Sequence, residues 1–227
     1  MTITATGLSA CRAGRAILHP TDMQIGPGEC VGLVGSSGSG KSTLGHALID
    51  ALRAGGQSVA HVPQSPDEAL DPLRSMGFHW REAERALSLA PDPDRQGALF
   101  EALHIAGGDL GTRPWGWSRG MQQRFVIAMA LIGTPDLLVM DEPTSALDPV
   151  VAADTMDLLD RYLADRSTAL LLITHDLGLA ARRVQRLMVM DAGRVVEDAP
   201  TAQVLSAPAT AAGRSLCAHR NWLELPC

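Results

Sequence analysis

The sequence predicts an α/β fold with a mostly parallel sheet. Three apolar runs support this prediction: CVGLVG, which leads into the glycine-rich turn SSGSGKST, and the later runs DLLVMDEP and TALLLITHD. Each run is short and nearly continuous, as in strands that are buried on both faces. Because a segment with helical spacing follows each run, we expect parallel strands with helices on both faces of the sheet.

The first half of the chain predicts two further parts. Residues 1–31 hold short alternating stretches broken by glycine and proline, and these favour a small antiparallel β part. A helix is expected from the glycine-rich turn to about Ala54, and QSVAHVPQ is expected to form a strand ending at Gln64. Residues 65–116 are rich in Ala, Leu, Arg and Glu with helical spacing, which predicts an inserted helical subdomain.

The second half returns to alternating strands and helices. Helices are expected in SRGMQQRFVIAMALIG, PVVAADTMDLLDRYLADR and LGLAARRVQ, and RLMVMDAGRVVEDA is expected to form two strands joined by a turn. A short alanine-rich tail is expected over residues 201–227. The predicted organisation is one domain over residues 1–227, whose core comprises residues 1–64 and 117–200.

Composition and charge exclude several classes of protein. A formal net charge of -6 argues against a nucleic-acid binder, which would hold phosphates with basic residues. The four cysteines are scattered without a CxxC pair, which fits a reducing compartment and predicts no cysteine metal site. Since no apolar run reaches about 18 residues, no membrane-spanning segment is expected, and work at a membrane would require a partner.

Residues 32–43, GLVGSSGSGKST, fit the phosphate-binding pattern G-x-x-x-x-G-K-[ST]. Glycines allow backbone N–H groups to approach phosphate oxygens, and the helix that follows points its positive end at the same anion. Lys41 is expected to reach the terminal phosphates, and the Ser42 hydroxyl is expected to bind Mg²⁺. The expected nucleotide-binding residues are Gly35, Ser36, Ser37, Gly38, Ser39, Gly40, Lys41, Ser42 and Thr43.

Polar residues follow three of the expected strands, at the sheet edge where ligands bind in open α/β folds. Asp141 is placed to hold the Mg²⁺ that Ser42 binds, and Glu142 is placed to orient or deprotonate an attacking water. Gln64 is expected to contact both Mg²⁺ and that water. His175 is placed to contact the γ-phosphate, so Glu142, His175 and Gln64 are the candidate catalytic residues.

Six ordered motifs resemble those of ATP-binding cassette (ABC) ATPases. WSRGMQQR resembles the LSGGQ-type signature, and it precedes LLVMDEPTSALD by the distance typical of that family. GSSGSGKST is similar to Walker A, HVPQSP to the Q-loop, LLVMDEP to Walker B, SALD to the D-loop and ITHD to the switch-histidine segment. GMQQRFVIAMALIGTPDLLVMDEPTSALDPV, EALDPLR and GRVVEDAPTAQVLSAPATAAGRSL are most similar to importers of the peptide, nickel and metallophore uptake subfamily.

The resemblance implies a P-loop NTPase fold and an ATPase with ATP and Mg²⁺ as cofactors. Ser118 and Gly120 would donate to the γ-phosphate bound by a second ATPase subunit, and Asp148 would line the same interface. That subunit would be a second copy or a homologue. The other implied partners are two transmembrane permease subunits and a periplasmic or lipoprotein substrate-binding protein, with no nucleic acid. The implied location is the cytoplasmic face of the inner membrane.

The sequence departs from the family pattern at four points. Arg119 replaces the first glycine of the signature, where it would either add positive charge near phosphate or disturb the loop. No aromatic residue precedes Phe78, so Arg12 or Arg15 is a candidate to stack on adenine. Only AGGQSVAHV separates the first helix from Gln64, which indicates a reduced antiparallel arm. The sequence stops soon after RVVED, without the cysteine-bearing extension of some peptide-uptake ATPases, so no iron–sulfur site is expected.

Two alternatives to an importer ATPase stay open. One is a soluble ABC protein of DNA repair or translation, against which the acidic charge argues. The other is a weakly catalytic member of a heterodimeric ATPase pair. For an importer, residues 65–116 would carry the surface that docks on the permease, with Leu70, Leu73, Met76, Phe78 and Trp80 as exposed candidates.

Overall fold

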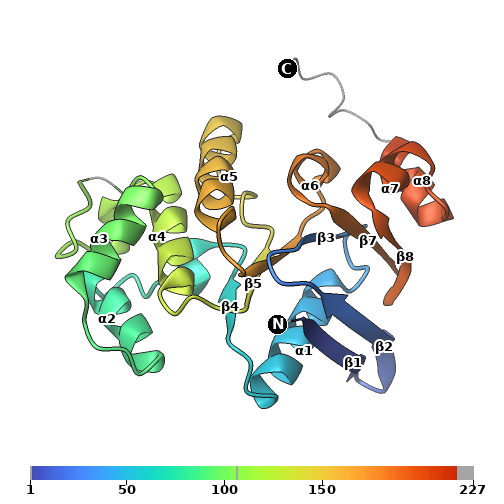
Figure 1. Ribbon diagram of the computed structural model, residues 1–227, viewed down its shortest axis with the longest axis horizontal. Coiled ribbons are helices and arrows are strands. Elements are labelled where there is room, and N and C mark those ends of the chain that lie inside the picture. The colour runs from blue at the N-terminus through green and yellow to red at the C-terminus, as the bar shows by residue number, and fades with distance from the viewer. Residues whose placement is uncertain (1, 106, 219–227) are drawn as a thin grey trace.

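A computed structural model describes residues 2–105 and 107–218 of the chain (Figure 1). A two-stranded antiparallel sheet pairs β1 (Ile3–Arg12) with β2 (Arg15–Ile25). A six-stranded sheet has the order β4-β5-β6-β3-β7-β8, and only β8 runs antiparallel to its neighbour. Its strands are β3 (Cys30–Gly35), β4 (Val59–Val62), β5 (Leu137–Asp141), β6 (Ala169–Ile173), β7 (Arg186–Asp191) and β8 (Arg194–Pro200). The predicted mixed sheet and small antiparallel part are confirmed.

Helices follow the strands in the predicted order. They are α1 (Lys41–Ala54), α2 (Met76–Ala86), α3 (Pro93–Ala102), α4 (Arg119–Leu131), α5 (Pro149–Leu163), α6 (Leu177–Arg183), α7 (Thr201–Ser206) and α8 (Ala211–Ala218), with 3-10 turns η1 (Pro66–Glu68) and η2 (Pro114–Gly116). Side-chain caps fix where several begin: Ser118 caps α4, Asp148 caps α5 and Asp176 caps α6. In the described ranges, no helix is long and apolar enough to cross a bilayer.

Alternating strand residues divide the core into two layers. Val31, Leu33 and Val139 pack with α1 and the β1–β2 sheet. Val34, Leu138 and their neighbours on the other face pack beneath α4, α5, α6 and α7. Figure 1 shows the first layer below the sheet and α5, α6 and α7 above it. Both faces of the sheet are therefore covered, which is why its strands read as continuous apolar runs.

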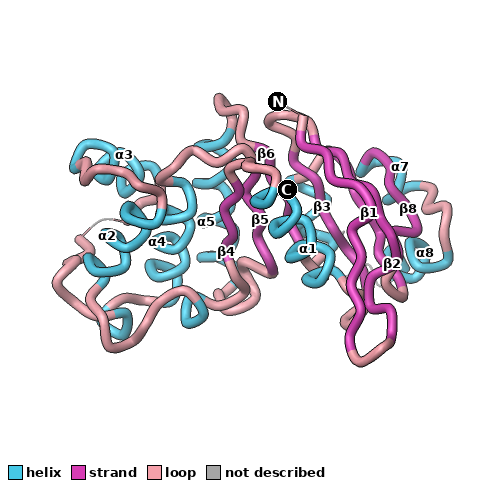
Figure 2. Tube along the Cα trace, turned by 90° about the horizontal axis from the view of Figure 1, so that it is seen from below, coloured by secondary structure: helices cyan, strands magenta, loops and turns pink. Residues whose placement is uncertain are grey.

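The inserted helices lie beyond the β4 edge of the sheet, where α2 and α3 pack against α4 (Figure 2). An aromatic cluster joins them: the ring centroid of Phe100 lies 5.2 Å from that of Trp80 and 5.9 Å from that of Phe125. Trp117 adds a further edge contact to Phe125 at 5.4 Å. These edge-to-face pairs hold α2, α3 and α4 together as a helical part, whose apolar side chains are continuous with the core layer on the α4 face of the sheet.

One expectation from the sequence needs correction. Leu70, Met76 and Trp80 are buried, with 3%, 0% and 2% of their surface exposed, so these three do not form a docking surface. They were placed wrongly because apolar residues at helical spacing look the same whether they face a small core or a partner. The segment expected as a short tail forms α7 and α8 over its first part, while residues 219–227 lie outside the described residues.

Candidate functional site

The phosphate loop connects the end of β3 to the start of α1. A Cβ on Gly35 would lie 2.3 Å from the carbonyl oxygen of Met190, so only glycine allows β3 and β7 to approach at this point. Gly38 has a φ of 78°, and nothing lies within 4 Å of the position that its Cβ would take. The loop backbone therefore borders open space there, and a phosphate group would fit into that space.

Lys41, the first residue of α1, folds back over this loop. Its Nζ donates to the carbonyl oxygens of Gly35 at 2.9 Å and Ser36 at 3.0 Å. Burial lowers the pKa of Lys41 below its usual value, although the charges of Glu142 and Asp141 act in the opposite direction. The ammonium group is thus held at the loop with two donors already used and a third free for an anion.

Asp141 ends β5 and offers an unsatisfied oxygen. Its Oδ1 is buried and has no hydrogen-bond partner in the described structure. Ser42 and Gln64 line the same cleft as Asp141. Hydroxyl, amide and carboxylate oxygens suit Mg²⁺, which usually takes one or two carboxylates and completes its shell with water and substrate phosphates. The donor set therefore fits Mg²⁺, and the residues described contain no group of three His, Cys, Asp or Glu that would hold a metal without phosphate.

Glu142 and His175 are held together at the carboxyl edge of the sheet. Oε1 of Glu142 lies 2.7 Å from His175 Nδ1 and accepts a hydrogen bond from the backbone N–H of His175 at 2.9 Å. Oε2 receives only a longer bond of 3.3 Å from the Thr174 hydroxyl. Glu142 also has a φ of 46°, a conformation that costs energy for a residue with a side chain and is frequent at functional sites.

These residues share one cleft of about 620 Å³. It is lined by Arg12, Ile17, Ser37, Gly38, Gly40, Lys41, Ser42, Thr43, Gln64, Asp141, Glu142 and His175. Arg12 but not Arg15 reaches the cleft, and Ile17 was not predicted because nothing near it in sequence resembles a binding motif. Gly35, Ser36 and Ser39 do not line the cleft.

Ser118, Gly120 and Asp148 lie outside this cleft. The hydroxyl of Ser118 caps α4 by accepting from the backbone N–H of Met121 at 3.3 Å. Gly120 packs so closely that a Cβ would lie 2.5 Å from Cγ1 of Val151. Asp148 caps α5 through bonds from Val150 and Val151. The structure therefore does not bring these residues to the phosphate loop of their own chain.

Arg119 neither disturbs the signature turn nor enters the cleft. It occupies the first position of a regular α4, and its guanidinium pairs with the carboxylate of Asp67. Of the two arrangements considered from the sequence, a disturbed loop is not observed.

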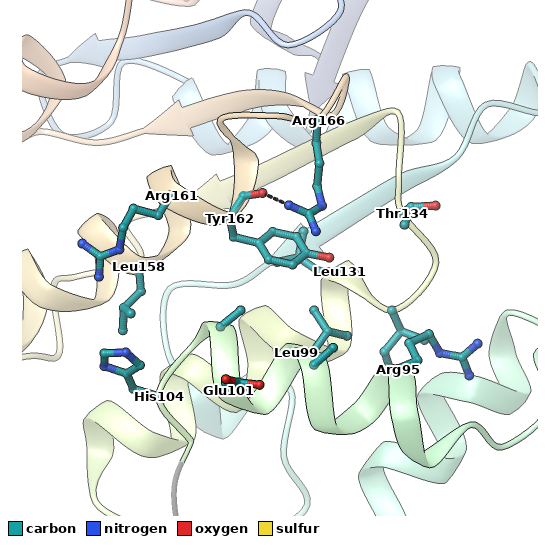
Figure 3. A pocket seen from close by; sticks show the side chains of 13 residues that line it. Arg95, Leu99, Glu101, His104, Leu131, Thr134, Leu158, Arg161, Tyr162 and Arg166 are labelled. Carbon is teal, nitrogen blue, oxygen red and sulfur yellow. Dashed lines mark hydrogen bonds between the residues drawn. The ribbon is translucent and has the colours of Figure 1, made fainter.

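A second cleft of about 460 Å³ lies between α3, the end of α4 and α5 (Figure 3). The Arg166 guanidinium stacks over the Tyr162 ring at 3.7 Å and also donates to the Tyr162 carbonyl oxygen. None of the motif residues lines this cleft, so the phosphate chemistry belongs to the first one.

The phosphate loop lies beside an acidic pair at the end of a strand, on a mostly parallel sheet that is covered on both faces. This combination defines a P-loop nucleotide hydrolase. Residues 18–145 match the family model described as ABC transporter, and the chain belongs to that family. Its ATP-binding domain makes the chain an ATPase.

Curated relatives agree with this assignment, and solved structures share the fold. The chain is 35% identical to the nickel import ATP-binding protein NikD of Rhodospirillum rubrum, over 89% of this chain and 87% of that protein. It is 33% identical to NikD of Pseudomonas putida, over 88% of each. A structure described as the ATP binding subunit of an ABC transporter shares the fold with a TM-score of 0.78 at 24% identity, covering 94% of this chain and 97% of that one. The cbiO1 structure from Clostridium perfringens, part of the ABC transporter complex cbiONQ, has a TM-score of 0.71 at 24% identity, covering 90% and 91%.

Proposed function

We propose that this chain is the ATP-hydrolysing subunit of an ABC importer for nickel, a peptide or a related metal chelate. The observation that carries the proposal is the similarity to nickel import ATP-binding proteins, which extends over 89% of this chain. The cleft holding Lys41, Asp141, Glu142 and His175 supports the same function, because it unites the groups needed to bind and hydrolyse ATP. An acidic pair connected to a histidine also favours a competent site over a weakly catalytic one.

The proposed reaction is attack of water on the γ-phosphorus of ATP. A bond forms between the water oxygen and phosphorus, and the bond from phosphorus to the bridging oxygen of ADP breaks. Oε1 of Glu142 is occupied by His175, whereas Oε2 has only the long bond from Thr174, so Oε2 is the oxygen that takes the water proton. Mg²⁺, held by Ser42, Gln64 and Asp141, would neutralise charge on the phosphate oxygens.

His175 has a positioning role toward Glu142 in addition to its proposed contact with the γ-phosphate. A carboxylate can only accept hydrogen bonds, so Nδ1 of His175 must carry the hydrogen that it shares with Glu142. The ring is then directed outward, with 69% of the side chain exposed. Loss of His175 is therefore expected to release Glu142 as well as the phosphate contact.

The complete site is proposed to need a second ATPase subunit, either a copy of this chain or a homologue. Ser118 and Gly120 lie outside their own cleft, which fits a role toward ATP bound by the partner, with Asp148 at the interface. Two transmembrane permeases and an external binding protein would complete the importer, and this chain would act at the cytoplasmic face of the membrane.

The docking surface for the permease is proposed to lie on the helical part. Leu73 and Trp115 are 73% and 63% exposed, and they flank a cleft of about 560 Å³ that Phe78 also lines. Arg74 stacks on Phe78 at 4.9 Å and Arg113 on Trp115 at 5.1 Å. A basic, aromatic surface suits a permease loop that carries apolar and acidic side chains.

Glu142→Gln tests the enzymatic part of this proposal. The amide keeps the shape of the side chain but cannot take a proton, so ATP binding should persist while turnover falls by about 10²-fold or more. Binding of labelled ATP and release of phosphate measure the two effects separately. Turnover at the wild-type rate would show that another group acts as the base. Uptake of radioactive nickel by the assembled transporter, compared with peptide uptake, tests the cargo.

A further inference from the structure

Arg119 makes a two-pronged contact that joins two separate segments of the chain. Its Nη1 donates to Oδ1 of Asp67 at 2.7 Å, and its Nη2 donates to Oδ2 at 2.6 Å. Parallel N–H···O bonds of this kind fix direction as well as distance, which a lysine cannot do. The residues are 52 positions apart in sequence, so the pair is a tertiary contact and not a feature of one helix.

On one side, the contact holds the turn that follows Gln64. Asp67 lies in η1, a turn capped by Ser65, whose hydroxyl also donates to Oδ2 of Asp67 at 3.2 Å. The carboxylate of Glu68 accepts a hydrogen bond from the backbone N–H of Ser65 at 3.1 Å. Because Ser65 is the direct neighbour of Gln64, a shift of Asp67 also shifts the segment that positions Gln64.

On the other side, the contact holds the start of α4. Arg119 directly follows the helix cap Ser118 and precedes Gly120, and its Nη1 also lies 3.4 Å from Oε1 of Gln122. Gln122 is buried and donates to the carbonyl oxygens of Pro114 at 2.7 Å and Trp117 at 3.0 Å. The guanidinium is thus the link between η1 and a buried network at the signature turn.

The chemistry of the pair supports attraction between full charges. The hydrogen bond from Arg119 lowers the pKa of Asp67 below its usual value, and the bond to Asp67 raises the pKa of Arg119. Both side chains are nevertheless accessible, with 48% of Arg119 and 64% of Asp67 exposed. An exposed pair is weak and sensitive to salt, so its effect is to hold the two segments locally and not to raise the global stability of the fold.

We propose that Arg119 is a positioning residue whose bidentate contact with Asp67 couples the signature turn to the Gln64 segment of the same subunit. This inference rests on the proposed role of Ser118 and Gly120 toward ATP in the partner subunit. When the pair is intact, the signature turn and Gln64 keep a fixed relative position. Gln64 then reaches the ATP in its own cleft at the same time as the signature turn reaches the ATP bound by the partner subunit. Where a glycine would leave the signature turn without a side-chain contact, Arg119 ties this turn to Asp67.

A double-mutant cycle in the assembled transporter tests the tether. Arg119→Gln and Asp67→Asn should each lower kcat for ATP by about 3- to 10-fold with KM changed less than twofold, and the double variant should lose no more than either single one. Arg119→Asp should lose more, because it faces Asp67, and Asp67→Arg added to it should restore part of kcat. Wild-type kcat should also fall more steeply with added salt than kcat of Arg119→Gln.

Arg85→Gln is the matched control. Arg85 forms an exposed pair with Glu82 on α2, in the same helical part but within one helix, so its loss should leave kcat and its salt dependence unchanged. A different result overturns the proposal: if Arg119→Gln raises KM while Asp67→Asn behaves as wild type, Arg119 acts on nucleotide directly.

Hydrogen exchange separates this inference from the proposed function. In the isolated chain, Arg119→Gln should speed amide exchange in residues 65–69 and 119–122, a result that requires neither a partner nor hydrolysis. Unchanged exchange contradicts the tether even if the importer function holds. Faster exchange with unchanged kcat contradicts the positioning role, since the contact would then exist without consequence for turnover.

Discussion

Gly120 is confined by packing as well as by its proposed contact with phosphate. A Cβ at this position would lie 2.5 Å from Cγ1 of Val151, on the first turn of α5. That turn is capped by Asp148, the residue expected at the subunit interface. The glycine therefore allows the signature turn and the segment after β5 to lie in contact, and a larger residue would move both.

Gly120→Ala tests this packing. The added methyl group should displace Val151 and cost about 1 to 3 kcal/mol of unfolding free energy, as overpacking does. Urea unfolding of the isolated chain measures that cost. Val151→Ala in the same chain should recover most of the stability by removing the opposing methyl groups, with Val151→Ala alone as the reference. ATPase activity should stay low in the double variant if Gly120 also approaches phosphate.

Lys41 should make ATP binding sensitive to alkaline pH. Burial lowers the pKa of Lys41, so its charge is lost at a lower pH than that of a free lysine. Bound phosphate favours the charged form, so affinity should fall as pH rises through the pKa of Lys41 in the free protein. Calorimetric titration with ATP between pH 7.5 and 10 measures this fall, in a range where the phosphate groups, with a second pKa of about 6, are already ionised. Lys41→Arg should bind more weakly but with little pH dependence.

At the residue scale, the sequence predicted the residues of the cleft where a local motif identifies them. Lys41, Ser42 and Asp141 lie together because a strand, a turn and a helix place them so. The sequence could not predict that Arg12 lines the cleft and Arg15 does not, or that Arg119 pairs with Asp67. Both depend on how distant segments pack, and neither has a signal in neighbouring residues.

Elements were predictable where apolar spacing is regular. The strands β5, β6 and β7 are buried runs, and α4 and α5 have clear caps. The helices α7 and α8 were not predicted, because their alanine-rich sequence carries little periodicity. Their formation depends on tertiary contacts: Val204 and Cys217 are buried against the rest of the protein.

Glu197 on β8 anchors the segment that leads into α8. Its carboxylate accepts from the backbone N–H of Ala209 at 2.8 Å and from the hydroxyl of Thr210 at 2.9 Å. Burial raises the pKa of Glu197, but these hydrogen bonds outweigh it and set the pKa below the usual 4.5. A depressed carboxyl pKa means that the ionised form stabilises the fold at neutral pH.

Glu197→Gln should therefore lower stability in a pH-dependent way. We expect a loss of about 1 to 2 kcal/mol at pH 7, because a neutral amide accepts more weakly and adds an unwanted donor. The difference from wild type should shrink as pH falls from the usual carboxyl pKa of 4.5, which the unfolded chain keeps, through the lower pKa of Glu197 in the folded protein. Urea unfolding at several pH values measures it. Glu101→Gln, at an exposed glutamate on α3, should show no such difference, and a constant gap at all pH values would contradict the assignment.

On the scale of the whole molecule, the helical part separates two kinds of surface. Its aromatic residues Trp80, Phe100 and Phe125 face inward and hold α2, α3 and α4 together. Leu73 and Trp115 face outward on the same part. If Leu73 and Trp115 contact a partner, the packed side chains of α2, α3 and α4 connect that contact to the signature turn at the start of α4.

Trp115→Ala tests the outward surface as the contact with the permease. Since Trp115 is 63% exposed, its loss should leave unfolding free energy and ATP affinity of the isolated chain within experimental error. Loss of a buried aromatic anchor at an interface costs about 2 kcal/mol or more, which corresponds to roughly a 30-fold weaker association with the permease. Co-purification and transport-coupled ATPase measure that loss. Val196 is 36% exposed and lies on β8, at the opposite edge of the sheet from β4, which the helical part adjoins, so Val196→Ala should associate as wild type. Normal association of Trp115→Ala would place the permease contact elsewhere, whereas a matching loss in Val196→Ala would indicate a general defect in assembly.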